Sequence, residues 1–290
     1  GSQYLNMGDT LAMQFAAARE VWDRAAQVSA AWDSQNEAQD RETSSLPQAS
    51  PRLADPLGAN SSRELFQLTE RVFPRPAFGA DESKAQLARL TATEWTQPAL
   101  AAHSLALLAV LRDLGVRADL VAGHSFGELL ALHATGVFDA DSALILARAR
   151  GLAMRDAAGQ AGAMCAVSEP IERVREWLNM HPDVVIANHN GPRQVVVSGA
   201  LQAIAAFEAD LLQKRVACTR LPVASAFHSP LVAKASDAFA AALQQVAVHA
   251  PELPVFGNSA AAYSLDATDI RQQLAGQLAK PVQFVQMIEA

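Results

Sequence analysis

Apolar residues recur at helical spacing near the start of the chain, and polar residues then take over. Segment 10–31 has an apolar position every three or four residues, which predicts a helix. Segment 33–62 is rich in Ser, Asp, Asn, Gln and Pro, so we expect a loop or mobile insertion there, with a short helix at 61–69. Segment 98–114 has no polar face, which predicts a buried helix.

A different rhythm begins in the stretch 163–223, where short β-branched runs alternate with helical patterns. The pattern predicts strands at 164–167, 184–188, 194–198 and 216–222, and helices at 171–180 and 201–214. This β-α-β-β-α-β order is typical of a ferredoxin-like subdomain. We expect that subdomain to be inserted into a larger one, which is formed by residues 1–162 and 224–290.

The residues on both sides of the insertion also alternate between strands and helices. Strands are expected at 118–122 and 254–258, and helices at 126–134, 141–157, 232–247 and 270–278. Such alternation is typical of a parallel sheet covered by helices. The predicted fold class is therefore α/β: an α/β hydrolase-like large subdomain with a parallel sheet, plus the small ferredoxin-like subdomain.

Composition and charge argue against several classes of function. The chain has 290 residues, half of them hydrophobic, and a net charge of −7, so we expect neither nucleic-acid binding nor a membrane span. A local basic patch could still meet an acidic partner. No signal peptide is apparent, so we expect a cytoplasmic protein. Cys165 and Cys218 lie in apolar runs, where two small core residues are expected in preference to a disulfide or a metal site.

Segment 123–128 reads Gly-His-Ser-Phe-Gly-Glu and follows an apolar, strand-like run. This G-x-S-x-G pattern is typical of a sharp strand–helix turn that exposes a nucleophilic serine, here Ser125. The N-terminus of the following helix favours negative charge that develops at the site. The alternative is a glycine-rich turn with an ordinary serine.

A serine hydroxyl needs a neighbouring base, and the chain has seven histidines. His124 is expected to line the turn and not to act as the base, because consecutive residues at a strand end point in opposite directions. His228 lies among small and apolar residues where the chain leaves the predicted small subdomain and can return to the edge of the sheet. We therefore rank His228 first as the base.

Arg150 lies on the apolar face of the helix expected at 141–157, opposite Arg148 and Arg155. A buried guanidinium is costly unless it is paired, and its planar fork suits a carboxylate. The residues alone leave two interpretations open. One is an ion pair with an acid of this chain, and the other is a site for the carboxylate of a substrate.

Several motifs follow one another along nearly the whole chain. They are Gly1-Ser2-Gln3 with Met7-Gly8, Thr96-Gln97-Pro98-Ala99, the turn at 123–128, Arg150-Gly151, Asn188 with Asn190, Ala226-Phe227-His228-Ser229, and Asn258. In type and order they resemble the motifs of the malonyl-CoA:acyl-carrier-protein acyltransferase family of fatty-acid and polyketide synthases.

This resemblance implies a ping-pong reaction with no permanently bound cofactor and no metal. Ser125 would attack the thioester of malonyl-CoA with His228 as base, and the malonyl group would then pass to the phosphopantetheine thiol of an acyl carrier protein. The N–H of Phe126 would hold the oxyanion, and the backbone carbonyl of Asn258 would orient His228. Arg150 would hold the malonyl carboxylate. The other substrate-binding residues implied are Gln97, His124, Phe227 and Asn190.

The resemblance also bears on substrate choice and partners. Phe227 and Phe126 are bulky and would crowd a 2-methyl group, although one methyl group is worth only about 1–3 kcal/mol of discrimination. Segments 90–94, 122–128 and 280–284 resemble acyltransferase domains of iterative polyunsaturated-fatty-acid and enediyne-type synthases. The implied partners are an acyl carrier protein and the neighbouring domains of a synthase.

The chain begins inside the family's N-terminal signature. The glutamine that would precede Gly1, and whose N–H completes the oxyanion hole in the family, is absent. Because loss of one such donor costs about 100- to 1,000-fold in rate, we expect this chain to transfer less well than one extended at its N-terminus.

Two other classes of function stay open. A serine thioesterase or esterase would need an acid to orient its base. Asp183 or Asp210 could serve as that acid, with His228 or His249 as the base. Release of free malonate would favour that class. A non-catalytic docking domain would leave Ser125 unacylated even in an extended chain.

Overall fold

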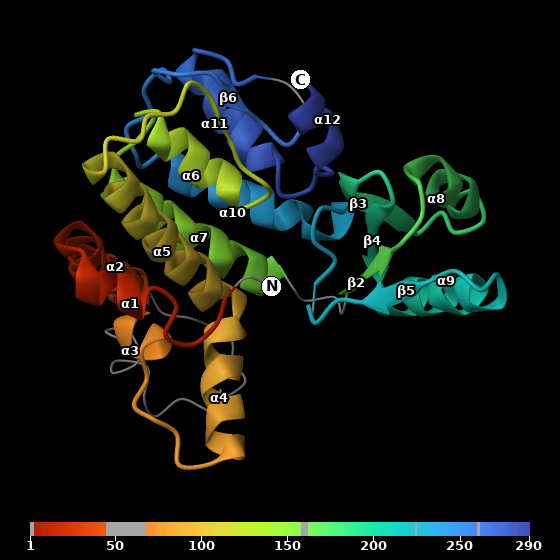
Figure 1. The fold of residues 1–290 in the computed structure, drawn as a ribbon, viewed down its shortest axis with the longest axis horizontal. Coiled ribbons are helices and arrows are strands. Elements are labelled where there is room, and N and C mark those ends of the chain that lie inside the picture. Colours follow the sequence, from red (N-terminus) through yellow and green to blue (C-terminus); the bar gives the residue numbers. More distant parts are fainter. Residues whose placement is uncertain (1–2, 45–67, 158–161, 224, 260–261) are drawn as a thin grey trace. The chain divides into compact units, whose positions relative to one another are not determined.

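A computed structural model describes residues 3–44, 68–157, 162–223, 225–259 and 262–290, without the side chains of residues 32–44 (Figure 1). The chain forms two compact units, Ser2–Val116 and Arg117–Ala290. In the part that is described, the first unit is helical and the second holds all the strands.

The unit Ser2–Val116 is built from helices. They are α1 (Asp9–Gln14), α2 (Ala16–Ser44), α3 (Leu68–Val72), α4 (Ala80–Thr91) and α5 (Thr93–Asp113). α2 packs along α5, and Trp22 of α2 and Leu105 of α5 are buried. The helix expected at 98–114 is confirmed, but it is not buried on all sides, because Leu107 and Leu111 are exposed.

The prediction of a loop at 33–62 is wrong where the structure describes that segment. α2 continues to Ser44, so residues 33–44 are helical. Gln, Glu, Ala and Arg in this segment are good helix formers and no Gly or Pro interrupts them, so polarity alone is a poor sign of a loop. Residues 45–67 lie outside the described residues, and of the helix expected at 61–69 only the start of α3 at Leu68 is described.

The unit Arg117–Ala290 alternates between strands and helices. Its elements are β1 (Val121–Ala122), α6 (Gly127–Ala134), α7 (Ala140–Ala157), β2 (Gly162–Val167), α8 (Ile171–Leu178), β3 (Val184–Gly191), β4 (Gln194–Ala200), α9 (Leu201–Gln213), β5 (Cys218–Arg220), the 3-10 helix η1 (Pro230–Val232), α10 (Ala233–Leu243), β6 (Val255–Phe256), α11 (Ala267–Gly276) and α12 (Phe284–Glu289). The strands and helices expected in this unit are all present, with bounds that differ by a few residues. The sequence pattern missed α4 and α12.

Two strands far apart in the sequence pair in parallel. Val121 of β1 lies opposite Val255 of β6, and Ala122 lies opposite Phe256. Because parallel strands end at the same edge, the turn after β1 and the residues after β6 meet there. α10 packs against both α7 and α11 within this unit (Figure 1).

The other sheet is antiparallel and has the order β3-β4-β2-β5. With α8 joining β2 to β3 and α9 joining β4 to β5, this is the ferredoxin-like arrangement (Figure 1). One face packs against both helices through an apolar core that includes Val197 and Phe207. The opposite face carries a smaller apolar cluster around Met164 and Val196.

The predicted fold class is confirmed, since both the parallel pair and the ferredoxin-like sheet are present. The subdomain boundaries, 1–162 with 224–290 for the large one and 163–223 for the small one, stay a prediction. No helix in the described part of the chain is long and apolar enough to cross a membrane.

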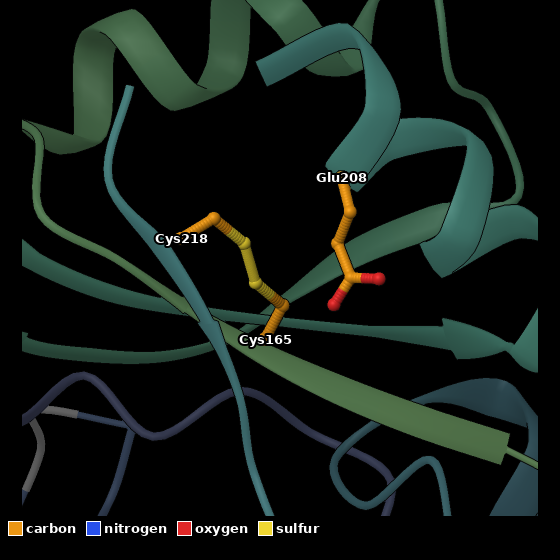
Figure 2. Close-up of side chains that lie close together, drawn as sticks. All are labelled: Cys165, Glu208 and Cys218. Carbon is orange, nitrogen blue, oxygen red and sulfur yellow. A yellow bond between two sulfur atoms is a disulfide. The ribbon is translucent and has the colours of Figure 1, made fainter. Parts of the chain in front are cut away.

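The prediction for the two cysteines is wrong, because Cys165 and Cys218 are joined by a disulfide (Figure 2). Cys165 of β2 lies opposite Arg220 of β5, and Val167 lies opposite Cys218, so the two cysteines are diagonal neighbours on one face of the sheet. Their Cα atoms are 6.3 Å apart, within the range that a disulfide spans. The register of β2 against β5 brings them together across 53 residues of sequence.

Candidate active site

Ser125 lies on a tight turn between β1 and α6. Its backbone has a φ of 50°, in the left-handed region that few residues other than glycine adopt. A side chain on Gly123 would overlap the backbone of Gly127 and Glu128, so the turn requires glycine at that position. The strand, the turn and the helix therefore have the form that the G-x-S-x-G pattern predicts for an exposed nucleophile.

The Ser125 hydroxyl faces the ring of His228. The Oγ atom lies 2.8 Å from His228 Nε2. On the other side of the ring, Nδ1 lies 2.9 Å from the carbonyl oxygen of Lys280 and 3.2 Å from that of Gln277. Because carbonyl oxygens only accept hydrogen bonds, Nδ1 carries the proton and Nε2 is left to accept one from Ser125.

Burial lowers the pKa of His228 to about 4, and the nearby positive charge of Arg150 acts in the same direction. The two carbonyl groups at Nδ1 oppose this shift only in part. The imidazole is therefore neutral at pH 7, which is the form that can take the Ser125 proton.

Asn258 has a role different from the predicted one. Its backbone carbonyl accepts the N–H of Gln283 at 2.8 Å, and the carbonyls recorded at His228 Nδ1 are those of Gln277 and Lys280. Its side-chain Oδ1 instead accepts the backbone N–H of Ser125 at 2.8 Å. Asn258 thus contacts the nucleophile turn, while Gln277 and Lys280 supply the carbonyls at the histidine, and a functional role for Asn258 stays a prediction.

Glu128 fixes Asn258 from below the turn. The carboxylate is buried and accepts hydrogen bonds from Asn258 Nδ2, from the Asn258 N–H at 3.3 Å and from the Tyr263 hydroxyl at 2.5 Å. Burial raises the pKa of Glu128, while these hydrogen bonds and the charge of Arg150 act in the opposite direction. The last residue of the 123–128 motif thus anchors the residue that holds Ser125.

Arg150 is buried on α7, with 2% of its surface exposed. One terminal nitrogen donates to the Met154 sulfur at 3.2 Å, and the other donates to the side-chain oxygen of Gln277 at 3.3 Å. The guanidinium carbon lies 5.8 Å from the centre of the Phe126 ring. Burial lowers the pKa of Arg150 to about 10, against the opposing charge of Glu128, so the side chain is still cationic at pH 7.

The other residues predicted to bind the substrate lie in three different places. His124 Nε2 lies 2.7 Å from Asn190 Oδ1, and the rings of His124 and Phe284 form a T-shaped pair. Phe227 packs against the apolar cluster around Met164 on the ferredoxin-like sheet. Gln97 belongs to the other unit, where its side chain donates to Thr93 at 3.0 Å, and its role as a substrate-binding residue stays a prediction.

Gln277 and Lys280 were missed from the sequence. Both act on His228 through backbone carbonyls, which every residue has, so their identity carries no signal. The one available hint is position, since the segment 280–284 that carries part of the resemblance begins at Lys280.

One group of potential metal ligands occurs in the described residues. The side-chain ligand atoms of Cys165, Glu208 and Cys218 lie within 4.8 Å of one another (Figure 2). The two sulfur atoms are bonded to each other, and metals bind the thiolate form of cysteine. The Glu208 carboxylate is paired with the guanidinium of Arg220. In this state the group is a disulfide beside an ion pair.

Comparison with known proteins relates this site to a family. The profile of the acyl transferase domain family matches residues 1–290. Mycoketide-CoA synthase of Mycobacterium tuberculosis is 43% identical over 169 residues, a match that covers 58% of this chain and 4% of that protein. The chain thus corresponds to a small part of that much longer synthase.

Two solved structures resemble the whole or most of the chain. The acyl-carrier-protein S-malonyltransferase of Bartonella henselae has a TM-score of 0.79 and 29% identity, covering 100% of this chain and 81% of that one. The acyltransferase domain of an iterative polyketide synthase in enediyne biosynthesis has a TM-score of 0.65 and 36% identity, covering 69% of this chain and 53% of that one. This chain belongs to the acyl transferase domain family.

Proposed function

We propose that this chain transfers a malonyl group from malonyl-CoA to the phosphopantetheine thiol of an acyl carrier protein. The observation that carries the proposal is the Ser125–His228 pair, 2.8 Å apart, in the same unit as the buried cation of Arg150. Family membership and the likeness to a malonyltransferase support it.

The first half-reaction forms an ester on Ser125. The Oγ atom bonds to the thioester carbonyl carbon while its proton passes to His228 Nε2. The carbon–sulfur bond to coenzyme A then breaks, and the departing sulfur takes that proton. In this proposal the developing oxyanion is held by the N–H of Phe126, the N-cap residue of α6. The carrier-protein thiol reverses these steps.

Arg150 holds the malonyl carboxylate in this proposal. Its guanidinium has a planar fork that can bind a carboxylate through two hydrogen bonds, and its burial strengthens the attraction. Phe126 and Phe227 limit the bulk at the 2-position of the acyl group. His124 and Asn190 are proposed to bind the substrate as a hydrogen-bonded pair.

The wider setting is also part of the proposal. The partners are an acyl carrier protein and neighbouring domains of a polyketide or fatty-acid synthase of the iterative type, in the cytoplasm. The substrate is malonyl-CoA, and the proposed chemistry uses no resident cofactor or metal.

The main alternative is a serine thioesterase. Such an enzyme would have Asp or Glu at the Nδ1 atom of its base. In the described residues that atom of His228 faces two backbone carbonyls, and the Asp210 carboxylate contacts His181 and Lys214. The geometry therefore favours transfer over the hydrolase alternative.

Intact-protein mass spectrometry after brief exposure to malonyl-CoA, acetyl-CoA or methylmalonyl-CoA tests the proposal. We expect a malonyl adduct that is lost in Ser125→Ala, with acetyl favoured over malonyl in Arg150→Ala. Malonyl-CoA consumed to free malonate, with no transfer to a carrier protein, would favour the thioesterase. No adduct and no consumption would contradict both enzymes.

A further inference from the structure

Gln277 contacts all three of the proposed functional groups of the site. It lies just after α11, with 4% of its surface exposed. Its side-chain nitrogen donates to the carbonyl oxygen of Ser125 at 3.3 Å, and its side-chain oxygen accepts from Arg150 at 3.3 Å. Its backbone carbonyl faces His228 at 3.2 Å.

The two sides of the amide cannot be exchanged. The guanidinium of Arg150 only donates hydrogen bonds, so it needs the oxygen of the amide. The backbone carbonyl of Ser125 only accepts, so it needs the nitrogen. A neutral amide is the side chain that satisfies both neighbours at once, and it does so without cancelling the positive charge of Arg150.

We infer that the Gln277 side chain is a positioning residue that aims the Arg150 guanidinium toward the acyl group on Ser125 and so sets the preference for acyl groups that carry a carboxylate. The inference rests on the proposed function. The charge of Glu128 already acts on Arg150, and a second acid at position 277 would bind the guanidinium directly and compete with malonate. An amide at that position holds the guanidinium without adding negative charge.

The side-chain role can be separated from the contact with His228. That contact uses the backbone carbonyl, which every substitution at this position retains. Gln277→Glu has nearly the same shape, but it places a negative charge against Arg150 and an acceptor against the Ser125 carbonyl. Gln277→Met has a similar volume and removes both hydrogen bonds without adding charge. Gln272→Glu makes the same chemical change at an exposed position of α11 and is the matched control.

The test is the ratio of malonyl to acetyl adduct formed on Ser125 per unit time, by intact-protein mass spectrometry, for the four proteins. A carboxylate at position 277 would pair with Arg150 and compete with the malonyl carboxylate, so the ratio should fall about ten- to a hundred-fold in Gln277→Glu. Gln277→Met only removes the hydrogen bonds of the amide, so the ratio should fall less. The readout is the ratio of the two rates, because a change that affects both acyl groups equally cancels in it. Gln272→Glu should match wild type in both rates.

Three outcomes would overturn the inference. An unchanged ratio in both Gln277 variants means that the amide does not set acyl preference. Equal losses of malonyl and acetyl transfer mean that the side chain serves the turn or the fold and not the carboxylate. If wild type takes up neither acyl group, the proposed function fails and the inference fails with it, which distinguishes this result from the first two.

Discussion

The ferredoxin-like sheet and the Ser125 turn belong to the same unit, but they are held together by different interactions. The sheet buries apolar side chains such as Val197 and Phe207 against its two helices. Around Ser125, buried polar and charged groups are joined by hydrogen bonds, as Glu128 and Asn258 are. Apolar packing is non-directional, whereas a buried polar network also fixes the positions and orientations of its members. Loss of a sheet side chain should lower stability alone, whereas loss of a network member should lower both stability and activity. Substitutions in the two regions should therefore have different consequences.

The largest effect is expected from Glu128→Ala, which removes the anchor of the polar network. Asn258 and Tyr263 would lose their common acceptor, and Arg150 would lose a compensating charge. Leaving buried groups unpaired in this way costs about 3–5 kcal/mol of unfolding free energy. Urea unfolding measures that loss, and acylation of Ser125 should also slow by at least about tenfold, because Asn258 no longer holds the turn.

Glu128→Gln is the control for the network. It keeps an acceptor for Tyr263 but turns an amide N–H₂ toward Asn258 Nδ2, so an intermediate loss is expected. A Glu128→Ala protein with wild-type unfolding free energy and acylation rate would show that the network does not support the site.

Phe207→Ala in the sheet should lower stability without changing the chemistry. The ring is fully buried on α9, and such a truncation costs about 3–5 kcal/mol. Acylation per folded molecule should stay within about twofold of wild type, because the hydrogen bonds recorded for the Ser125 turn in the described residues do not involve α9. Leu212→Ala on the same helix is the control, since that side chain is 77% exposed and its loss should cost less than about 0.5 kcal/mol. If the acylation rate per folded molecule also falls in Phe207→Ala, the sheet and the Ser125 turn do not differ in their effect on the chemistry.

The same contrast explains how far the sequence predicts the structure. The ferredoxin-like pattern could be predicted because strand and helix periodicities are local. The serine turn could be predicted because its close backbone contacts require glycine at Gly123. The disulfide was not predictable, because it depends on the register of β2 against β5. The contact of Asn258 was misassigned and that of Gln277 was missed, because neither a backbone carbonyl nor a long-range hydrogen bond leaves a pattern in the neighbouring residues.

The smallest change in acylation rate is expected when the pH is varied. This experiment tests whether the charge of Arg150 affects the protonation of His228. Since burial and the charge of Arg150 lower the pKa of His228 to about 4, the neutral, active imidazole persists well below pH 6. With acetyl-CoA, the rate of Ser125 acylation should be nearly constant from pH 8 to about pH 5 and fall about tenfold per pH unit below about pH 4. Single-turnover mass spectrometry across this range gives the profile.

The Arg150→Ala variant then shows in which direction the charge of Arg150 shifts the pKa of His228. Removing the cation makes protonation of His228 easier, so its pKa rises and the loss of acylation begins at a higher pH than in wild type. Acetyl-CoA is the substrate for both proteins, because its acyl group has no carboxylate for Arg150 to bind. A profile that does not move, or that moves to lower pH, would mean that the arginine does not act on the histidine. A shift to higher pH would mean that the group proposed to hold the carboxylate also keeps the base unprotonated, so that one buried cation serves both substrate choice and catalysis.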